Sequence, residues 1–170
     1  KTNINNKIVG LPIRINKEEK VLNNDSSSDF VICIIGGSQG AQSLSINIAE
    51  SIKSVQDNSK KRIIVFHQCR SEDLESLKAY YKTHNINNDV RVFFDEMAKV
   101  LSRSNLVISR SGSSTVNEII YYCIPSILIP YPHASDNHQY YNAKNLNTSE
   151  CTKIISNDSV NLENIINSIC

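Results

Sequence analysis

The sequence lacks an excess of charge of either sign. Eighteen Lys and Arg residues stand against seventeen Asp and Glu residues, which leaves a formal net charge of +1. No bulk basic surface therefore favours nucleic acid, and we expect no nucleic-acid partner. The chain also lacks the run of about 18 apolar residues that a transmembrane helix needs, so we expect no membrane span.

Cysteines are few and scattered. The five lie at positions 33, 69, 123, 151 and 170, and no C-x-x-C pair occurs. An odd number of widely spaced cysteines predicts neither a disulfide framework nor a zinc site. We therefore expect buried thiols in a reducing compartment and no metal site.

The length excludes two well-buried domains. The 170 residues, 40% of them apolar and 21% charged, suit one ordinary globular domain. The chain begins at Lys1 without a signal-peptide pattern and stops at Cys170 within an apolar-periodic segment. We expect a domain excised from a longer protein, with residues 1–15 as a linker and residues 16–170 as the domain.

Apolar runs alternate with amphipathic segments along the chain. Phe30 to Ile35 is a continuous apolar run that ends at Gly36-Gly37, which is typical of a strand buried on both faces. The same reasoning predicts strands at 30–35, 62–66, 89–94, 105–109, 125–130 and 152–155, and helices at 41–56, 71–83, 96–102, 114–122, 136–146 and 161–169. This alternation predicts an α/β, Rossmann-like fold, a parallel sheet of about six strands with helices on both faces.

The first candidate binding loop is G-G-S-Q-G-A at 36–41, between a strand and a helix. In such sheets ligands bind outside the carboxyl ends of the strands, and glycines with free N–H groups favour phosphate. The loop is not a P-loop, because no Gly-Lys-Ser/Thr follows. It is not a complete dinucleotide motif either, because His67-Gln68 stands where an acid would end the second strand. A tight turn without a ligand is the alternative.

The second candidate loop, R-S-G-S-S-T at 110–115, places hydroxyls and backbone donors at another helix N-terminus. Glu118 lies one turn further on the face of Ser114, where a carboxylate can accept hydrogen bonds from a ribose diol. The alternatives are an N-cap role for Ser113 or Ser114 and a capping-box or solvent-facing role for Glu118. Two such loops in one sheet favour a nucleotide diphosphate as ligand.

The third candidate loop runs from Pro130 to Tyr140 and carries His138 and Gln139, whose polar groups can bond sugar hydroxyls without bringing charge. His138 taken singly also suits a surface or capping role. His67 and His84 are expected to be structural or at the surface. We find no paired carboxylates, Ser–His–Asp set or His/Cys cluster, so we name no catalytic residue.

Five stretches in this order resemble the donor-binding half of a GT-B glycosyltransferase, and more closely the MurG family. They are G-L-P-I-R at 10–14, G-G-S-Q-G-A at 36–41, F-F-D-E-M at 93–97, R-S-G-S-S-T-V-N-E at 110–118, and 125–142, which contains D-N-H-Q-Y-Y-N. The family transfers N-acetylglucosamine from UDP-N-acetylglucosamine to lipid I, giving lipid II of peptidoglycan synthesis. The resemblance covers about residues 10–155, and it implies that residues 16–170 are the UDP-sugar donor domain and that an N-terminal domain is missing.

The resemblance also implies roles at the nucleoside. Phe94 would present backbone groups to the uracil edge, with Met97 near the base. Glu118 would bind the ribose hydroxyls.

Further roles fall at the diphosphate and the sugar. Hydroxyls and helix N-terminal amides would hold the diphosphate, at Ser38, Ser113, Ser114 and Thr115, and the substrate-binding set includes the neighbouring Gly37 and Gln39. Gln139, with His138 beside it and Asn142 one turn further, would read the sugar hydroxyls. Arg14 would lie near the phosphates at the interdomain cleft.

By the same resemblance, the reaction needs no cofactor and no obligatory metal, since helix termini and side chains stabilise the leaving UDP. The catalytic residue, the lipid I site and the patch that contacts the cytoplasmic face of the bacterial inner membrane would belong to the missing domain. Leu11 replaces the family's usual Asn, and His138 stands where many members have Gln, which leaves sugar selectivity open.

The leading hypothesis is therefore the donor domain of an inverting, lipid II-forming glycosyltransferase. One alternative is another GT-B-like enzyme of sugar nucleotides, such as a different glycosyltransferase or a UDP-N-acetylglucosamine 2-epimerase. A second alternative is a non-catalytic nucleotide-binding module. An NAD(P)-dependent Rossmann enzyme comes last, because the acid that would end the second strand is missing.

Overall fold

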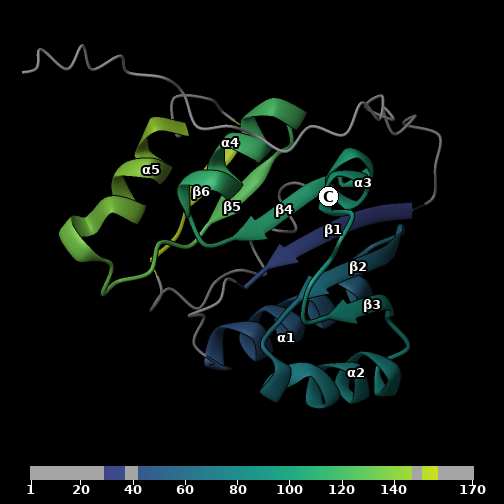
Figure 1. Cartoon of the computed structure of the whole chain (residues 1–170). Coiled ribbons are helices and arrows are strands. Elements are labelled where there is room, and N and C mark those ends of the chain that lie inside the picture. The colour runs from purple at the N-terminus through teal and green to yellow at the C-terminus, as the bar shows by residue number, and fades with distance from the viewer. Residues whose placement is uncertain (1–28, 37–41, 147–150, 157–170) are drawn as a thin grey trace, which may run out of the picture.

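The computed structural model describes residues 29–36, 42–146 and 151–156 (Figure 1). Within these ranges the strands are β1 (Asp29–Ile35), β2 (Arg62–Gln68), β3 (Asn87–Arg91), β4 (Leu106–Ser109), β5 (Ser126–Leu128) and β6 (Thr152–Ile154). The α-helices are α1 (Gln42–Asn58), α2 (Leu74–Thr83), α3 (Met97–Arg103), α4 (Ser113–Tyr122) and α5 (His138–Leu146). Short 3₁₀ helices, η1 (Ser71–Asp73) and η2 (Ser135–Asn137), precede α2 and α5. The expected linker at 1–15 and the expected helix at 161–169 lie outside the described residues.

The six strands form one parallel sheet in the order β3-β2-β1-β4-β5-β6. β1 lies near the centre because its sequence, D-F-V-I-C-I-I, is apolar almost throughout, so both of its faces can be covered. Strand order reverses between β1 and β4, with β2 and β3 on one side and β5 and β6 on the other. Such a reversal is where open α/β sheets form their ligand crevice.

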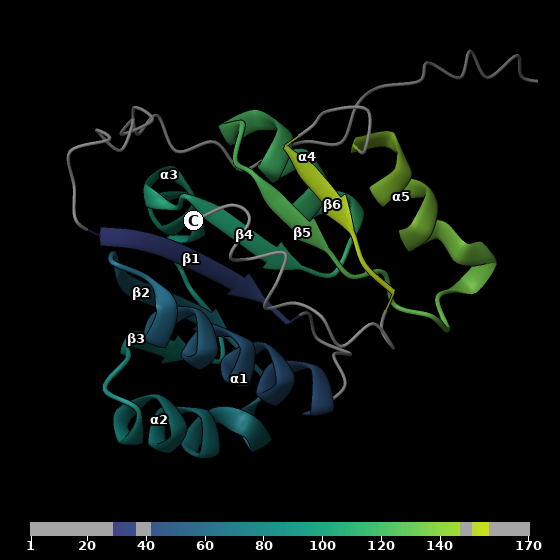
Figure 2. The same cartoon turned by 180° about the vertical axis from the view of Figure 1, so that it is seen from behind.

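Helices cover both faces of the sheet (Figures 1 and 2). On one face, Ile52 of α1 and Leu77 of α2 join the inner side chains of β1 and β2 in one core. On the other face, a second core includes Leu101 of α3, Ile119 of α4 and Ala143 of α5. The predicted fold class, a Rossmann-like parallel sheet of six strands with helices on both faces, is confirmed.

The third strand differs most from its predicted range, because it spans 87–91 and not 89–94. β3 is an edge strand with the polar sequence N-N-D-V-R, which an apolar pattern does not reveal. The apolar residues Val92 and Phe93 lie beyond it and are exposed, and Phe93 is 61% accessible. Phe94 turns back into the core. The apolar run at 92–94 therefore lies in a loop, and the path of the chain decides which of its side chains are buried.

The helix predicted from residue 136 begins two residues later, at His138. Asp136 and Asn137 have φ of 51° and 52°, in the left-handed region that no right-handed α-helix contains. The predicted strand at 125–130 is likewise shorter, since β5 covers only 126–128.

Of the cysteines in the described ranges, Cys33 and Cys69 are buried, and burial raises the pKa of the Cys33 thiol to about 12. Cys123 and Cys151 are exposed, so the expectation of buried thiols is wrong for these two. Cys123 ends α4 with a left-handed φ of 49°, a position at which the chain turns away from the helix. Sequence runs around Cys123 are apolar, but the turn places this residue at the surface.

A buried polar pair lies between the sheet and α2. The Tyr81 hydroxyl lies 3.0 Å from Nδ1 of His67, and both residues are buried. Desolvation by burial lowers the pKa of His67 to about 4, with a smaller opposing effect from the Asp73 carboxylate. His67 is therefore neutral near pH 7 and has the structural position that we expected.

This buried histidine should make the protein less stable as the pH falls below neutral. In the unfolded chain a histidine takes up a proton near pH 6.5, whereas folded His67 stays neutral down to about pH 4. Between these values the unfolded state binds the extra proton, so the free energy of unfolding should drop by about 1 kcal/mol from about pH 7.5 to about pH 5.5. Equilibrium urea unfolding at both pH values measures this drop in the free energy of unfolding. The His67→Gln variant should lose most of this dependence, and an unchanged dependence would contradict the assignment.

Candidate functional site

The carboxyl ends of β1 and β4 meet at the switch point of the sheet. The backbone N–H of Arg110, just after β4, donates to the carbonyl of Ile35 at the end of β1 (N···O 3.4 Å). Gly36 donates its N–H to the Gln68 carbonyl (3.1 Å), and a Cβ at position 36 would lie only 3.1 Å from that oxygen. This close approach favours glycine at position 36. The two glycine-bearing loops therefore leave adjacent strands.

A cavity of about 450 Å³ opens at this edge of the sheet. Its walls come from the ends of β1 and β2, the segment between β3 and α3, the start of α3 and the first turns of α4. The lining residues are Ile35, Gln68, Phe93, Phe94, Asp95, Met97, Ala98, Ser114, Thr115 and Glu118. Its size is within the range of small-molecule sites. The structure thus brings together five predicted residues from two separate motifs, namely Phe94, Met97, Ser114, Thr115 and Glu118.

The start of α4 forms one wall of this cavity. Gly112 is the N-cap residue, with φ −64° and ψ 147°, and no side-chain capping bond is present at this helix start. The alternative that Ser113 or Ser114 is the N-cap is therefore wrong, and Glu118 lies too far into the helix for a capping box. As in every α-helix, the N–H groups of the first turn have no partner within the helix, so they can bind an anion.

Two predicted residues of α4 differ in position. Glu118 is half-buried at the cavity wall, one helical turn beyond Ser114 on the same face. Ser113 is exposed and does not line the cavity, although its carbonyl accepts a hydrogen bond from Nδ2 of Asn117 (2.7 Å). The carboxylate of Glu118 and the start of α4 therefore offer acceptors and donors, respectively, to a ligand in the cavity.

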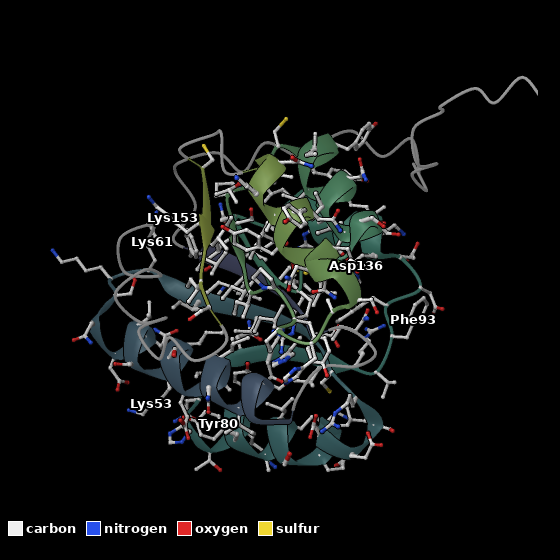
Figure 3. All side chains as sticks on the ribbon, turned by 90° about the vertical axis from the view of Figure 1, so that its left-hand side faces the viewer. Lys53, Lys61, Tyr80, Phe93, Asp136 and Lys153 are labelled. Carbon is white, nitrogen blue, oxygen red and sulfur yellow. The ribbon has the colours of Figure 1, made fainter. Side chains whose placement is uncertain are left out.

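The segment between β3 and α3 forms the opposite wall. Phe94 is only 4% exposed, and its ring packs edge-on against Phe66 with the centroids 6.1 Å apart. The Arg91 guanidinium carbon lies 5.3 Å from the Phe94 ring centroid. Because the ring is anchored in the core, a ligand would meet mainly the backbone of Phe94. Phe93 projects from the surface (Figure 3) and also lines the cavity.

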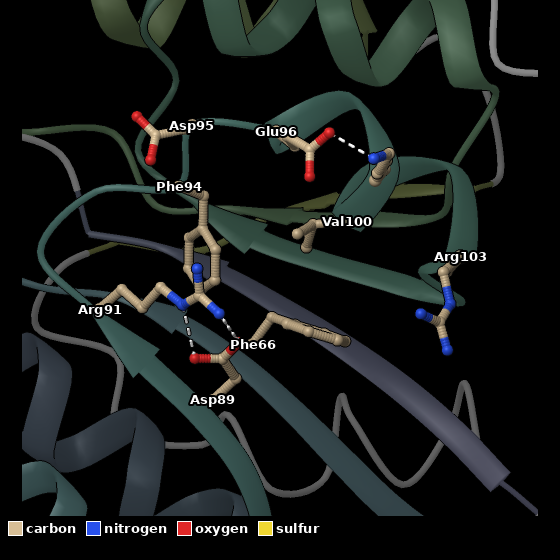
Figure 4. Close-up of a pocket in the computed structure, with 9 residues that line it drawn as sticks. Phe66, Asp89, Arg91, Phe94, Asp95, Glu96, Val100 and Arg103 are labelled. Atoms are coloured by element: carbon tan, nitrogen blue, oxygen red, sulfur yellow. Dashed lines mark hydrogen bonds and ion pairs between the residues drawn. The ribbon is translucent and has the colours of Figure 1, made fainter.

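A second cavity of about 220 Å³ adjoins the first, since Phe94 and Asp95 line both (Figure 4). It contains three acids and three cations among its lining residues, which are Phe66, Asp89, Arg91, Phe94, Asp95, Glu96, Lys99, Val100 and Arg103. Arg91 donates two hydrogen bonds of 2.8 Å to Asp89, and Lys99 pairs with Glu96. Its lining charges balance, so it has no excess positive charge for a phosphate.

The third predicted loop lies outside the lining of the larger cavity. Gln139 accepts a hydrogen bond at Oε1 from the backbone N–H of Tyr131 (2.9 Å), and Asn142 donates from Nδ2 to the Ser111 carbonyl (3.1 Å). Exposed His138 donates from Nδ1 to the Ser135 carbonyl (2.8 Å). The polar side chains of this loop therefore hold the loop itself and its neighbour in place.

Arg110 stabilises the segment after β5, which leads into this third loop. Its side chain is buried, and Nη1 donates to the carbonyls of Ile129 (3.0 Å) and Pro130 (3.2 Å). The guanidinium lies over the ring of Tyr131, 5.5 Å from the centroid, and burial lowers the pKa of Arg110. This cation links the loop after β4 to the segment after β5.

Sequence reasoning missed five lining residues, which are Ile35, Gln68, Phe93, Asp95 and Ala98. Gln68 ends the strand beside β1, so its position at the sheet edge was a usable signal. Phe93 and Asp95 lie inside the recognised F-F-D-E-M motif. Arg14, Gly37, Ser38 and Gln39 lie outside the described residues, so the structure does not place these four predicted site residues.

Residues 29–36, 42–146 and 151–156 contain neither a metal-binding cluster nor a membrane-spanning helix. No group of three or more His, Cys, Asp or Glu residues in these ranges is placed to hold a metal ion. No helix within them is both long and apolar enough to cross a membrane.

The chain is similar in sequence to a known domain family and to named bacterial proteins. Residues 31–170 match the glycosyltransferase family 28 C-terminal domain. The UDP-N-acetylglucosamine–N-acetylmuramyl-(pentapeptide) pyrophosphoryl-undecaprenol N-acetylglucosamine transferase of Rickettsia bellii is 40% identical over 147 residues, which are 86% of this chain and 41% of the relative. The enzyme of the same name from Agrobacterium fabrum is 41% identical over 132 residues, covering 78% of this chain and 35% of the relative. The chain thus spans about two fifths or less of these relatives.

Solved structures agree with this match. The crystal structure of MurG from Acinetobacter baumannii superposes with a TM-score of 0.69 at 30% identity and covers 86% of this chain and 41% of that one. The kitacinnamycin glycotransferase superposes with a TM-score of 0.60 at 13% identity, covering 92% and 37%, which shows a shared fold alone. The MurG resemblance inferred from five motifs is thereby confirmed, and the chain belongs to the glycosyltransferase family 28 C-terminal domain family.

Proposed function

We propose that this chain binds UDP-N-acetylglucosamine as the donor domain of an inverting glycosyltransferase. In the complete protein, N-acetylglucosamine would pass to lipid I and give lipid II for peptidoglycan synthesis. Family membership supports this proposal, as do the names of the Rickettsia bellii and Agrobacterium fabrum relatives, which describe an N-acetylglucosamine transfer to an N-acetylmuramyl-pentapeptide lipid.

One observation carries the proposal, namely the shared cavity between the start of α4 and the segment after β3. Glu118 can accept hydrogen bonds from two adjacent ribose hydroxyls, because each carboxylate oxygen is an acceptor. The first turn of α4, with Ser114 and Thr115, offers N–H and hydroxyl donors to a diphosphate. Phe94 and Met97 line the wall where the base would lie.

The start of α4 also supplies a physical reason for catalysis. As the glycosidic bond breaks, negative charge builds on the departing diphosphate. The partial positive charge at a helix N-terminus and preorganised N–H donors stabilise that charge more in the transition state than in the ground state. The proposal therefore includes no cofactor and no obligatory metal.

The remaining predicted residues complete the proposed site. Gln139 and its neighbours His138 and Asn142 would read the sugar, and Ser113 would assist at the diphosphate. The residues outside the described ranges, Gly37, Ser38, Gln39 and Arg14, would bind from the first loop and the linker.

The acceptor chemistry is proposed for the portion of a longer protein that this chain does not span. That portion would carry the lipid I site, the catalytic base and a peripheral contact with the cytoplasmic face of the bacterial inner membrane. We include no nucleic-acid partner, because the net charge of +1 offers no basic surface.

Isothermal titration of the chain with UDP-N-acetylglucosamine, UDP-glucose and NADH tests the proposal. We expect uridine nucleotides to bind, UDP-N-acetylglucosamine most tightly, with no turnover by this chain alone. NADH should not bind, because Gln68 and not an acid ends β2. Binding of NADH without any uridine nucleotide would contradict the proposed function.

A further inference from the structure

Ser111 connects the loop after β4 to the start of α5. Its side chain is 0% exposed, and its hydroxyl donates to the backbone carbonyl of Gln139 (2.8 Å). In return, Nδ2 of Asn142 donates to the carbonyl of Ser111 (3.1 Å). Two hydrogen bonds of opposite direction therefore join segments that are about 30 positions apart in the sequence, counted from 111 to 139 and 142.

The start of α5 needs such a connection. Asp136 and Asn137, which precede the helix, both have positive φ, an uncommon backbone state for residues other than glycine. The apolar residues that α5 buries, Ala143 and Leu146, lie in its second half. Between them and the turn, Tyr140 and Tyr141 are exposed. The bonds from Ser111 and Asn142 therefore hold a first turn that has little hydrophobic anchoring of its own.

The side chain of Gln139 is oriented by its own bond. Its Oε1 accepts from the backbone N–H of Tyr131, and only the amide oxygen can accept from an N–H group. The remaining polar group of this side chain is Nε2, which has two N–H donors. Gln139 thus offers donors, which suit the lone pairs of sugar hydroxyls.

We infer that Ser111 is a positioning residue for sugar recognition, because it fixes the turn that carries Gln139 against the loop that leads into α4. Gly112, the N-cap of α4, directly follows Ser111. Ser111 therefore sets the distance between the donors proposed for the diphosphate and the donor proposed for the sugar. This inference rests on the proposed function, and it adds a residue that does not itself touch the ligand.

The test compares the affinities for UDP and UDP-N-acetylglucosamine by titration calorimetry of the full chain. The ratio Kd(UDP)/Kd(UDP-N-acetylglucosamine) isolates the contribution of the sugar. In Ser111→Ala we expect this ratio to fall about fivefold, the usual worth of one hydrogen bond. The Kd for UDP itself should change less than about twofold, since the amides of α4 remain.

Ser126→Ala is a matched control. Ser126 on β5 is also 0% exposed, and its hydroxyl bonds to Oγ1 of Thr152 (3.1 Å). This variant should lose comparable thermal stability with no change in the ratio. In a Gln139→Ala background, Ser111→Ala should lower the ratio no further, because its effect passes through Gln139.

Each outcome is decisive. Three outcomes would overturn the inference, namely an unchanged ratio in Ser111→Ala, a continued fall of the ratio in the Gln139→Ala background, or a wild-type ratio of one. In each case, UDP binding by the wild-type chain would leave the proposed function standing. Wild-type chain that binds neither nucleotide would overturn both. If Ser111→Ala fails to fold, Ser111→Cys replaces it, and its weaker donor should give a smaller fall in the same direction.

Discussion

Replacing Glu118 with alanine is expected to weaken the binding of UDP by about 1–3 kcal/mol, which is roughly 5- to 150-fold in Kd. The carboxylate lies at the wall of the 450 Å³ cavity, beside the start of α4. Without it, the ribose hydroxyls of a bound nucleotide would lose their acceptor while still leaving bulk water. Titration calorimetry with UDP measures the change.

Two further variants make this result specific. Glu118→Gln keeps the size of the side chain but leaves one acceptor oxygen, so its Kd should lie between those of the wild type and Glu118→Ala. Glu75→Ala removes an exposed carboxylate of α2, which pairs with Lys78 (3.3 Å) away from the cavity, and should leave UDP affinity unchanged. Unaltered UDP affinity in Glu118→Ala would remove Glu118 from the site.

Replacing Ile32 with alanine is expected to lower the free energy of unfolding by about 2–5 kcal/mol. Ile32 is fully buried in β1, with Val65 of β2 and Leu106 of β4 as its neighbours in register. Truncation removes apolar contacts on a strand that is paired on both sides. The neighbouring side chains therefore cannot easily fill the space that the truncated side chain leaves. Equilibrium urea unfolding measures the loss.

Ile120→Ala is the control for this substitution. Ile120 lies on α4 and is 54% exposed, so its truncation should change stability by no more than about 0.5 kcal/mol. A loss below about 1 kcal/mol in Ile32→Ala, or equal losses in the two variants, would contradict the central position assigned to β1.

The central part of the fold could be predicted because its signals are local. The apolar run of β1 ends at Gly36, and the three- and four-residue spacing of α1 and α4 marks amphipathic helices. The parallel sheet of about six strands and the helices on both faces follow from the alternation of these elements. Predictions worked where a residue's environment depended on its near neighbours in the chain.

Boundaries failed where distant contacts decide them. β3 has a polar sequence because it lies at the sheet edge, and the apolar Val92 and Phe93 that follow it are exposed. Cys123 lies in an apolar stretch but ends a helix at the surface. None of these environments can be read from periodicity, since each depends on which segment packs nearby.

The candidate site divides in the same way. The resemblance to the MurG family named Phe94, Met97 and Glu118, which the structure places around one cavity. It also named Gln139 as a residue that binds the sugar hydroxyls. It did not reveal that the Gln139 side chain accepts a hydrogen bond from the backbone N–H of Tyr131. Ser111 was visible only as part of a motif, because its two partners lie about 30 positions later.

By itself, the sequence determined the strand–helix alternation, the near-neutral charge and the motifs that mark the carboxyl edge of the sheet, because these depend on residue type and local spacing. The tertiary structure decided which motifs share a cavity, which apolar residues stay exposed and how Ser111 joins the loop after β4 to α5. These outcomes depend on contacts between segments far apart in the chain, and the packing of the sheet with its two layers of helices brings those segments together.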